Sequence, residues 1–199
     1  MEPAQTDHPV HDLIATRWSP YGFEDRAVSR EDLLSLLEAA RWAPSSYNEQ
    51  PWAFIVATRE DSQEFQRAVG CLVEGNQAWA QRAPVLLLCL ISRNFTRNGK
   101  PNAAAEHDLG LAAASLTLEA TARGLSVHQM IGIVADKIRS EYQVPEGYDP
   151  LTAIAIGYAA KLDDVPAELR DRDRERRGRK PLSEFVFGGK FGAASSQLG

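Results

Sequence analysis

The hydrophobic positions of this chain follow two spacings, which predict helices and strands. Apolar residues recur at helical spacing, or fill an alanine- and leucine-rich stretch, in residues 29–41, 61–69, 76–82, 103–123 and 136–142. Continuous apolar or extended segments of strand length occupy residues 52–57, 85–91, 126–133 and 151–160. Because strands and helices do not alternate regularly, the pattern favours a three-layer α+β fold over a doubly wound parallel sheet.

Short sequence motifs mark two of the helix ends, and nothing in the sequence indicates more than one domain. Ser29 followed by Asp32 is typical of a helix start, and Gly124 stands where a C-terminal cap would end the long helix. No repeat or linker is evident in the 199 residues, so we expect a single domain over residues 1–199, with residues 1–12 flexible.

Composition narrows the class of protein. There is no run of about 18 apolar residues that would span a membrane. The N-terminal segment is polar and acidic, unlike a signal peptide, so we expect a cytoplasmic protein without a membrane partner. The formal net charge of -5 argues against a nucleic-acid partner, although residues 168–180 hold seven basic and four acidic side chains. Cys89 lies inside an apolar run, and a disulfide with Cys71 is not expected.

The stretch Arg41 to Trp52 is a polar loop between an apolar helix and an apolar strand. Pro44 and Pro51 restrict its two ends, so the loop is expected to be stiff. It presents neutral donors and acceptors without an acid, base or nucleophile that has a local partner. Such a loop is better suited to contacting the edge of a flat polar ligand than to catalysis by its own side chains.

Two basic elements stand at opposite ends of the chain. Arg17 and Ser19 lie on the same side of an extended segment, where both can bind a phosphate. Arg177 and Arg179 flank a glycine and precede Pro181 and an apolar segment, so they can be held in place. The charged residues 170–176 are interpreted as a solvated surface. Neither Gly-x-Gly-x-x-Gly after a strand nor a Gly-Lys-Ser/Thr phosphate loop is present, which disfavours a Rossmann site.

Pro-Ser-Ser-Tyr-Asn-Glu-Gln-Pro-Trp, at residues 44–52, resembles the signature of the FMN-dependent nitroreductase family, and the resemblance extends over residues 17–182. In that family the two basic elements meet at the FMN phosphate, the polar loop reaches the flavin of the other subunit, and a segment like residues 129–132 lies against the isoalloxazine ring. The FMN-binding residues implied here are Arg17, Trp18, Ser19, Pro44, Ser45, Ser46, Asn48, Gln50, Asn76, Gln129, Met130, Ile131, Gly132, Arg177 and Arg179.

The resemblance also implies a function. We expect a three-layer α-β-α fold with a central mixed, mainly antiparallel sheet, in an intertwined homodimer whose apolar tail, residues 183–199, packs on the partner. A hydride would pass from NADH or NADPH through FMN to a nitroaromatic, quinone or related small-molecule acceptor by a ping-pong mechanism. No catalytic side chain and no metal are needed, since the flavin carries the chemistry.

Two alternatives stay open. One is a specialised flavoprotein of the same fold, such as a dehalogenase or an enoate or semialdehyde reductase, although the short loop at residues 93–102 leaves little room for a dedicated lid. The other is a flavin-binding or sensor module without turnover, which NADH or NADPH would not bleach.

Other candidate residues fit these readings less well. His8 and His11 have no evident third metal ligand. His107 and Asp108 are helix neighbours whose side chains point about 100° apart, so they are not expected to share a proton. His128 is interpreted as part of a site wall. Trp42 and Trp52 are expected to anchor the polar loop by packing.

Overall fold

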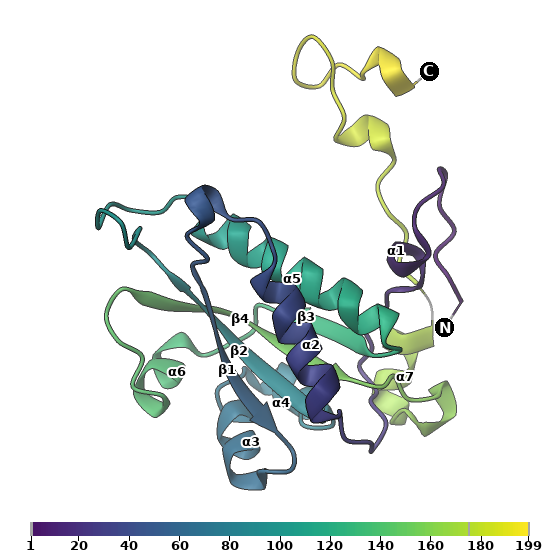
Figure 1. Cartoon of the computed structure of the whole chain (residues 1–199). Helices are drawn as coiled ribbons and strands as arrows, with labels where there is room; N and C mark the ends of the chain where they lie inside the picture. Colours follow the sequence, from purple (N-terminus) through teal and green to yellow (C-terminus); the bar gives the residue numbers. More distant parts are fainter. Residues whose placement is uncertain (1, 175, 199) are drawn as a thin grey trace.

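A four-stranded sheet with helices on both faces organises the chain (Figure 1). The computed structural model describes residues 2–174 and 176–198. Met1, Glu175 and Gly199, which belong to the predicted flexible start, the arginine-rich segment and the tail, lie outside the described residues. The strands are β1 (Trp52–Thr58), β2 (Val85–Ser92), β3 (Ser126–Met130) and β4 (Tyr148–Gly157). Their order is β1-β2-β4-β3 and all three pairings are antiparallel, which confirms the mainly antiparallel sheet; no parallel pair occurs among the described residues.

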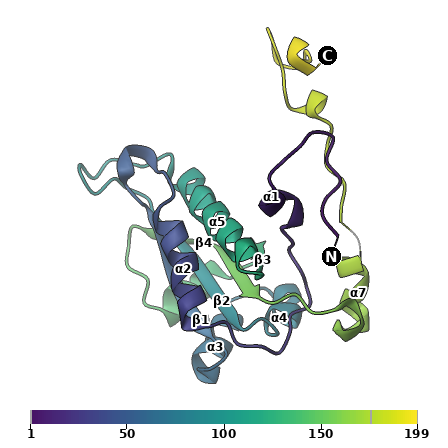
Figure 2. The same cartoon turned by 45° about the vertical axis from the view of Figure 1, so that its right-hand side comes forward.

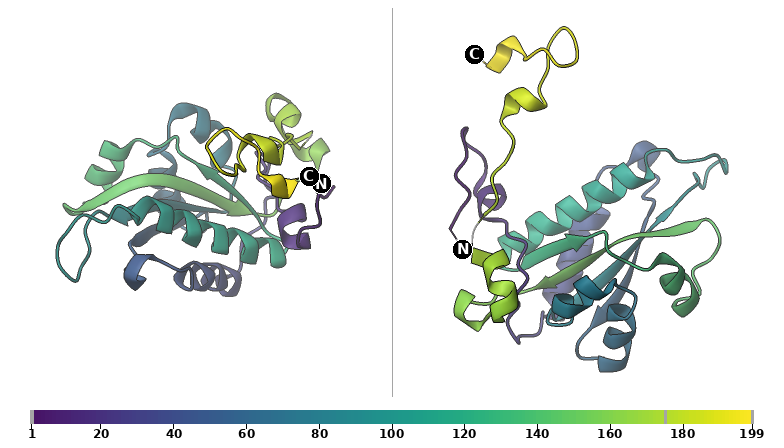
Figure 3. Two further views of the ribbon diagram at one scale, coloured as in Figure 1. Left: turned by 90° about the horizontal axis from the view of Figure 1, so that it is seen from above. Right: turned by 180° about the vertical axis from the view of Figure 1, so that it is seen from behind.

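Helices cover the two faces of the sheet and create two cores, which confirms the three layers (Figure 3). One face is covered by α3 (Ser62–Val69), α4 (Glu74–Ala80) and α6 (Ala135–Glu141), and the other by α2 (Arg30–Arg41) and α5 (Ala105–Ala122). Leu86 and Leu88 pack into the first core, whereas Leu87 and Cys89 pack into the second. Because successive side chains of a strand point to opposite faces, a strand buried on both faces is apolar at successive positions, as β2 is from Val85 to Ile91.

Most predicted boundaries are confirmed within a few residues. Ser29 caps α2 by accepting the backbone N–H of Asp32, and Gly124 ends the α5 region with φ +72°. The helix predicted at residues 76–82 begins earlier, at Glu74, and ends at Ala80. β4 likewise begins before the predicted residue 151 and contains Pro150, which the sheet tolerates because the β2–β4 register shifts between Cys89 and Leu90.

The two ends of the chain contain helices that the sequence pattern did not predict. These are α1 (Asp12–Thr16), which His11 caps, and α7 (Ala167–Arg174). Both lie at one end of the molecule, and residues 176–198 extend away from the body as a tail (Figure 2). Short 3₁₀ turns complete the chain: η1 (Ser46–Asn48), η2 (Leu162–Asp164), η3 (Leu182–Glu184) and η4 (Ser196–Leu198). No helix in the described part is long and apolar enough to cross a membrane.

Candidate functional site

The two predicted basic elements meet in the structure at a place that we call the basic corner: Arg17, Ser19, Arg176, Arg177 and Arg179. Arg176 connects them, because its guanidinium donates to the backbone carbonyls of Thr16 at 3.0 Å and Arg17 at 2.7 Å. Arg17 donates to the hydroxyl of Ser19 at 2.9 Å. Segments 159 residues apart in the chain are therefore side by side.

The arginine-rich segment is not only a solvated surface. That interpretation was wrong for Asp173, for Arg176 and for the partly buried Arg170, which donates to the carbonyls of Asp163 and Val165. The buried carboxylate of Asp173 accepts the backbone N–H groups of Tyr21, at 2.8 and 3.0 Å, and Gly22, at 2.7 Å. Arg176 lies over the ring of Trp18, with its guanidinium carbon 5.2 Å from the ring centre. These contacts fix the chain around Arg17, and no local sequence signal distinguishes Asp173 and Arg176 from their charged neighbours.

The charge of the basic corner is uncompensated among the described residues. No carboxylate in residues 2–174 and 176–198 forms an ion pair with Arg17, Arg176, Arg177 or Arg179. The pKa of Arg17 is lowered by burial and then by the nearby Arg179, and that of Arg176 by burial and then by Arg17 and Arg179. Gathering like charges is unfavourable unless an anion offsets it, so this corner suits a phosphate group.

The predicted ring-edge segment, residues 129–132, packs closely against Asn76, and we call this pair of segments the cradle. A Cβ on Gly132 would lie 2.4 Å from the amide nitrogen of Asn76, so only glycine lets the two segments approach. Asn76 donates to the Gly132 carbonyl at 3.1 Å and accepts from the indole of Trp79 at 3.3 Å. Asn76 therefore braces the cradle, and this bracing limits the direct ligand contact that the sequence suggested.

The other predicted ring-edge residues differ in what they offer a ligand. The amide of Gln129 donates to the hydroxyl of Thr117 at 3.1 Å, which fixes its side chain. Met130 is buried in the core with 7% exposure, so only its backbone can face a ligand. Ile131 is 85% exposed and presents an apolar surface beside Gly132.

His128 forms part of the wall between the basic corner and the cradle. Its Nδ1 lies 2.8 Å from the Pro20 carbonyl, so the ring is the tautomer that donates from Nδ1. The ring packs between Tyr21, 4.7 Å away, and Trp79, 4.3 Å away, between ring centres. Burial lowers the pKa of His128, Arg177 acts in the same direction, and the Pro20 carbonyl and Asp173 oppose the shift. A neutral imidazole in an aromatic cage agrees with the predicted wall.

The lowered pKa of His128 makes stability depend on pH. The unfolded chain takes up this proton at a higher pH than the folded chain, so the His128 contribution is complete above the usual pKa of about 6.5 and is lost as the pH falls below it. We expect His128→Gln to lose less unfolding free energy than the wild type between about pH 7 and pH 5, measured by urea unfolding. His8→Gln, at an exposed position, should behave like the wild type. Equal losses in all three proteins would contradict the assignment.

The polar loop, residues 44–51, holds an unusual backbone. Tyr47, Asn48 and Gln50 have φ values of 55°, 55° and 51°, in a region that residues other than glycine rarely adopt. Ser45 accepts the Gln50 N–H at 3.0 Å, and the Gln50 amide donates to the Asn48 carbonyl at 3.0 Å. These internal bonds agree with the predicted stiffness. They hold three of the predicted FMN-binding residues, Ser45, Asn48 and Gln50, in fixed positions around one turn.

Asp108, at the start of α5, attaches this loop to the body. Its nearly buried carboxylate accepts the Ser46 N–H at 2.9 Å and lies 3.0 Å from Nδ1 of His107. The expectation that His107 and Asp108 would not share a proton was wrong, because the exposed imidazole folds back onto its neighbour. The sequence analysis considered Asp108 only as a partner of His107 and missed its role in supporting the loop; an acid within an alanine-rich helix was the signal that could have found it.

The flanking tryptophans behave differently from each other. Trp52 packs against the second core, as predicted. Trp42 is 75% exposed and its indole donates to Glu38 at 2.8 Å, so the expected packing of Trp42 is wrong. Because Trp42 stands one residue past the end of α2, its side chain faces outward from the helix C-terminus.

In space, the polar loop lies near the start of α5 and the basic corner near its end, on opposite sides of the molecule (Figures 1 and 2). Ser46 is tied to Asp108, whereas Gln129 is tied to Thr117, nine residues further along α5. That separation is about 14 Å along the helix axis, and the basic corner lies beyond it. The predicted FMN-binding residues are thus divided between two places near opposite ends of α5.

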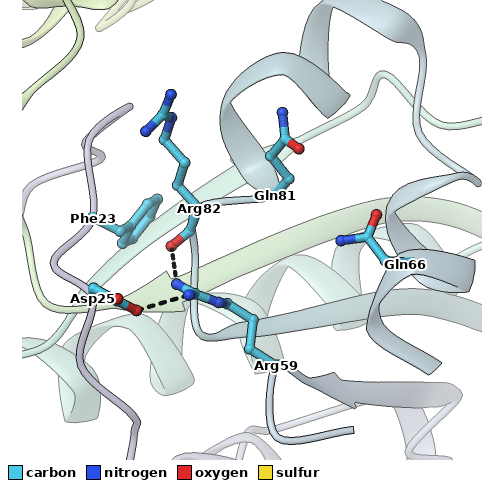
Figure 4. Close-up of a pocket in the computed structure, with 6 residues that line it drawn as sticks. All are labelled: Phe23, Asp25, Arg59, Gln66, Gln81 and Arg82. Carbon is cyan, nitrogen blue, oxygen red and sulfur yellow. Dashed lines mark hydrogen bonds and ion pairs between the residues drawn. The ribbon is translucent and has the colours of Figure 1, made fainter. Parts of the chain in front are cut away.

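No predicted site residue lines the surface hollow of about 500 Å³ drawn in Figure 4. There Arg59 donates to Asp25 at 2.7 Å and to the Arg82 carbonyl at 3.2 Å. The guanidinium of Arg59 is therefore already satisfied. Among the described residues no group of His, Cys, Asp and Glu side chains could hold a metal ion.

Known proteins resemble this chain in sequence. The sequence model of the nitroreductase family matches residues 14–158. A Methanothermobacter thermautotrophicus relative, provisionally named as an NADH dehydrogenase/NAD(P)H nitroreductase, is 31% identical over 169 residues, which cover 83% of this chain and 84% of the relative. The major NAD(P)H-flavin oxidoreductase of Aliivibrio fischeri is 43% identical over 93 residues, 46% of this chain and 43% of that protein.

Solved structures share the same architecture. The crystal structure of an oxidoreductase containing FMN has a TM-score of 0.88 and 36% identity, and the match covers 96% of both chains. An FMN-dependent nitroreductase from Clostridium difficile R20291 has a TM-score of 0.69 and 23% identity over 90% of this chain and 98% of its own. The second likeness supports the fold.

Proposed function

Because the chain belongs to the nitroreductase family, we propose that it is an NAD(P)H-dependent FMN oxidoreductase that reduces a nitroaromatic, quinone or related acceptor by a ping-pong mechanism. It works as a homodimer with shared sites. It acts in the cytoplasm, an assignment that agrees with its two free, buried cysteines, Cys71 and Cys89.

The basic corner is the observation that carries the FMN assignment. Arg17, Ser19, Arg177 and Arg179 supply donors for one phosphate group, and the hydrogen bonds of Arg176 and Asp173 hold their two segments together. The glycine cradle at Gly132 lies beyond the wall formed by His128. A phosphate site followed by a segment in which the N–H groups of Ile131 and Gly132 have no backbone acceptor among the described residues fits a flavin mononucleotide.

The residues of this chain bind and orient FMN and keep water away from it, and they need not transfer protons. When bound, FMN supplies the redox chemistry by taking a hydride from NAD(P)H and giving it to the acceptor. The backbone N–H groups of Ile131 and Gly132, which follow β3, would stabilise negative charge on the edge of the bound ring. His128 is neutral and its Nδ1 proton is held by the Pro20 carbonyl, so it serves as a wall.

A second subunit is needed to complete the site. The polar loop faces away from the basic corner of its own chain, so its Ser45, Ser46, Asn48 and Gln50 serve the flavin of the partner. The tail has the apolar surface that such a dimer would bury, since Phe185 is 57% and Phe191 is 93% exposed in the single chain.

We expect the purified protein to be yellow, or to become so on addition of FMN, and to be bleached by NADH or NADPH without air. Initial rates at several fixed quinone or nitroaromatic concentrations should give parallel double-reciprocal lines against NAD(P)H, because donor and acceptor use one site in turn. Intersecting lines would exclude the ping-pong mechanism. Bound flavin that neither dinucleotide bleaches would favour a sensor module without turnover.

A further inference from the structure

A hairpin at residues 94–101, after β2, lies against the polar loop and is fixed to it (Figure 1). A bridge between Asn94 and Pro101 closes the hairpin. The Thr96 N–H donates to the Glu49 carboxylate at 2.6 Å, and the rings of Tyr47 and Phe95 meet edge to face with centres 5.8 Å apart. The hairpin therefore forms one unit with the polar loop.

This unit places a single guanidinium at the rim of the loop. The guanidinium carbon of Arg97 lies 4.1 Å from the centre of the Tyr47 ring and 5.3 Å from that of Phe95. Stacking on aromatic rings orients the planar group but leaves its N–H edges available. Within residues 2–174 and 176–198 Arg97 makes no ion pair or side-chain hydrogen bond, and the carboxylate of Glu49 is already used by Thr96.

The backbone of Tyr47 explains why its ring is at the rim. With φ of 55° the residue turns its side chain out of the loop, where it is 74% exposed. An exposed aromatic ring that carries an arginine gives a surface with one apolar face and one oriented cation. Such a surface matches a flat ligand that bears a negative charge at one edge.

We propose that Arg97 recognises an oxyanion on the molecule that exchanges electrons with the flavin beneath the polar loop. This inference rests on the proposed function, because the loop covers a flavin only in the homodimer. The oxyanion belongs either to an aromatic acceptor, as a carboxylate, or to NADPH, as its 2′-phosphate. Both sources present the same chemistry to a guanidinium, which binds carboxylate and phosphate groups with two parallel hydrogen bonds.

The test uses the FMN-loaded dimer and two pairs of probes that differ in one charged group. Benzoate and benzamide are titrated while the flavin absorbance is followed, and kcat/KM is measured for NADPH and NADH. For one of these pairs, Arg97→Ala should lower the affinity or the kcat/KM of the member that carries the extra oxyanion (benzoate or NADPH) about tenfold, and that of its counterpart (benzamide or NADH) less than about twofold. Lys100→Ala removes a cation of the same hairpin that stacks on neither ring and should change neither pair.

The pattern of losses separates the outcomes. A selective loss for benzoate assigns the oxyanion to the acceptor, and a selective loss for NADPH over NADH assigns it to the dinucleotide. Equal weakening of benzoate and benzamide with an unchanged NADPH preference would mean that Arg97 only supports the loop, which would overturn the proposal. No change in either pair would overturn it too. A protein that binds no FMN would instead refute the proposed function itself.

Discussion

Replacing Arg17 with alanine is expected to raise the dissociation constant for FMN about 10- to 100-fold, because a hydrogen bond to a charged group contributes about 1.5–3 kcal/mol. Arg17 is half-buried, and its partner Ser19 and the neighbouring Arg179 face the same corner. Arg177→Ala and Arg179→Ala should act in the same direction. Fluorescence quenching of FMN during titration measures all three variants.

Arg172→Ala and Arg174→Ala are the matched controls, since they remove the same charge from α7. Arg174 pairs with Asp171 on the surface at 3.4 Å, and Arg172 lies over the Tyr21 ring at 5.1 Å. Exposed pairs of this kind contribute less than about 1 kcal/mol, so FMN affinity should change less than about fivefold. Equal losses at all five positions would show that the arginines act only as a diffuse positive field.

Truncation after Lys180 is expected to abolish dimerisation at micromolar concentrations and with it most FMN binding. Every described hydrogen bond of residues 183–198 stays within residues 180–198, so the tail is not fixed to its own body. It still has internal structure, since Phe187 pairs with Ala194 and its ring lies 4.7 Å from that of Phe191. An ordered apolar arm without intramolecular support indicates an intermolecular partner. Sedimentation and FMN titration of the truncated chain measure both effects.

Two point variants make this test more specific. Phe191→Ser removes the most exposed large apolar side chain of the tail, at 93% exposure, and should weaken the dimer measurably. Lys190→Ala, next to it, should not. A truncated protein that stays dimeric and binds FMN normally would contradict a role of the tail in the shared site.

The sequence anticipated the elements whose cause is local. The apolar run of β2, the Ser29 cap and Gly124 each depend on a few adjacent residues, and the structure has them where the pattern predicts. The prolines and polar side chains of residues 44–51 likewise indicated a stiff loop. Its positive φ angles at Tyr47, Asn48 and Gln50 were not foreseeable, because strain at such positions is held by the surrounding fold.

The residues that escaped sequence reasoning act over long separations in the chain. Asp173 holds the backbone of Tyr21 and Gly22, Arg176 holds the carbonyls of Thr16 and Arg17, and Asp108 holds Ser46. In the sequence, the first two look like members of a mixed charge run, and Asp108 shows its helix but not its partner Ser46, 62 residues away. Only burial distinguishes a charge with a fixed partner from one that is solvated.

The sequence by itself therefore determined which residues make up the polar loop and the two basic elements, and the helices and strands beside them, because motifs and periodicity are local properties of the chain. The tertiary structure decided which segments meet. It brought Arg17 to Arg176, placed the polar loop at the far end of α5 from the basic corner, and left the tail away from the body. These relations depend on helix length and on buried long-range hydrogen bonds, which no local pattern encodes.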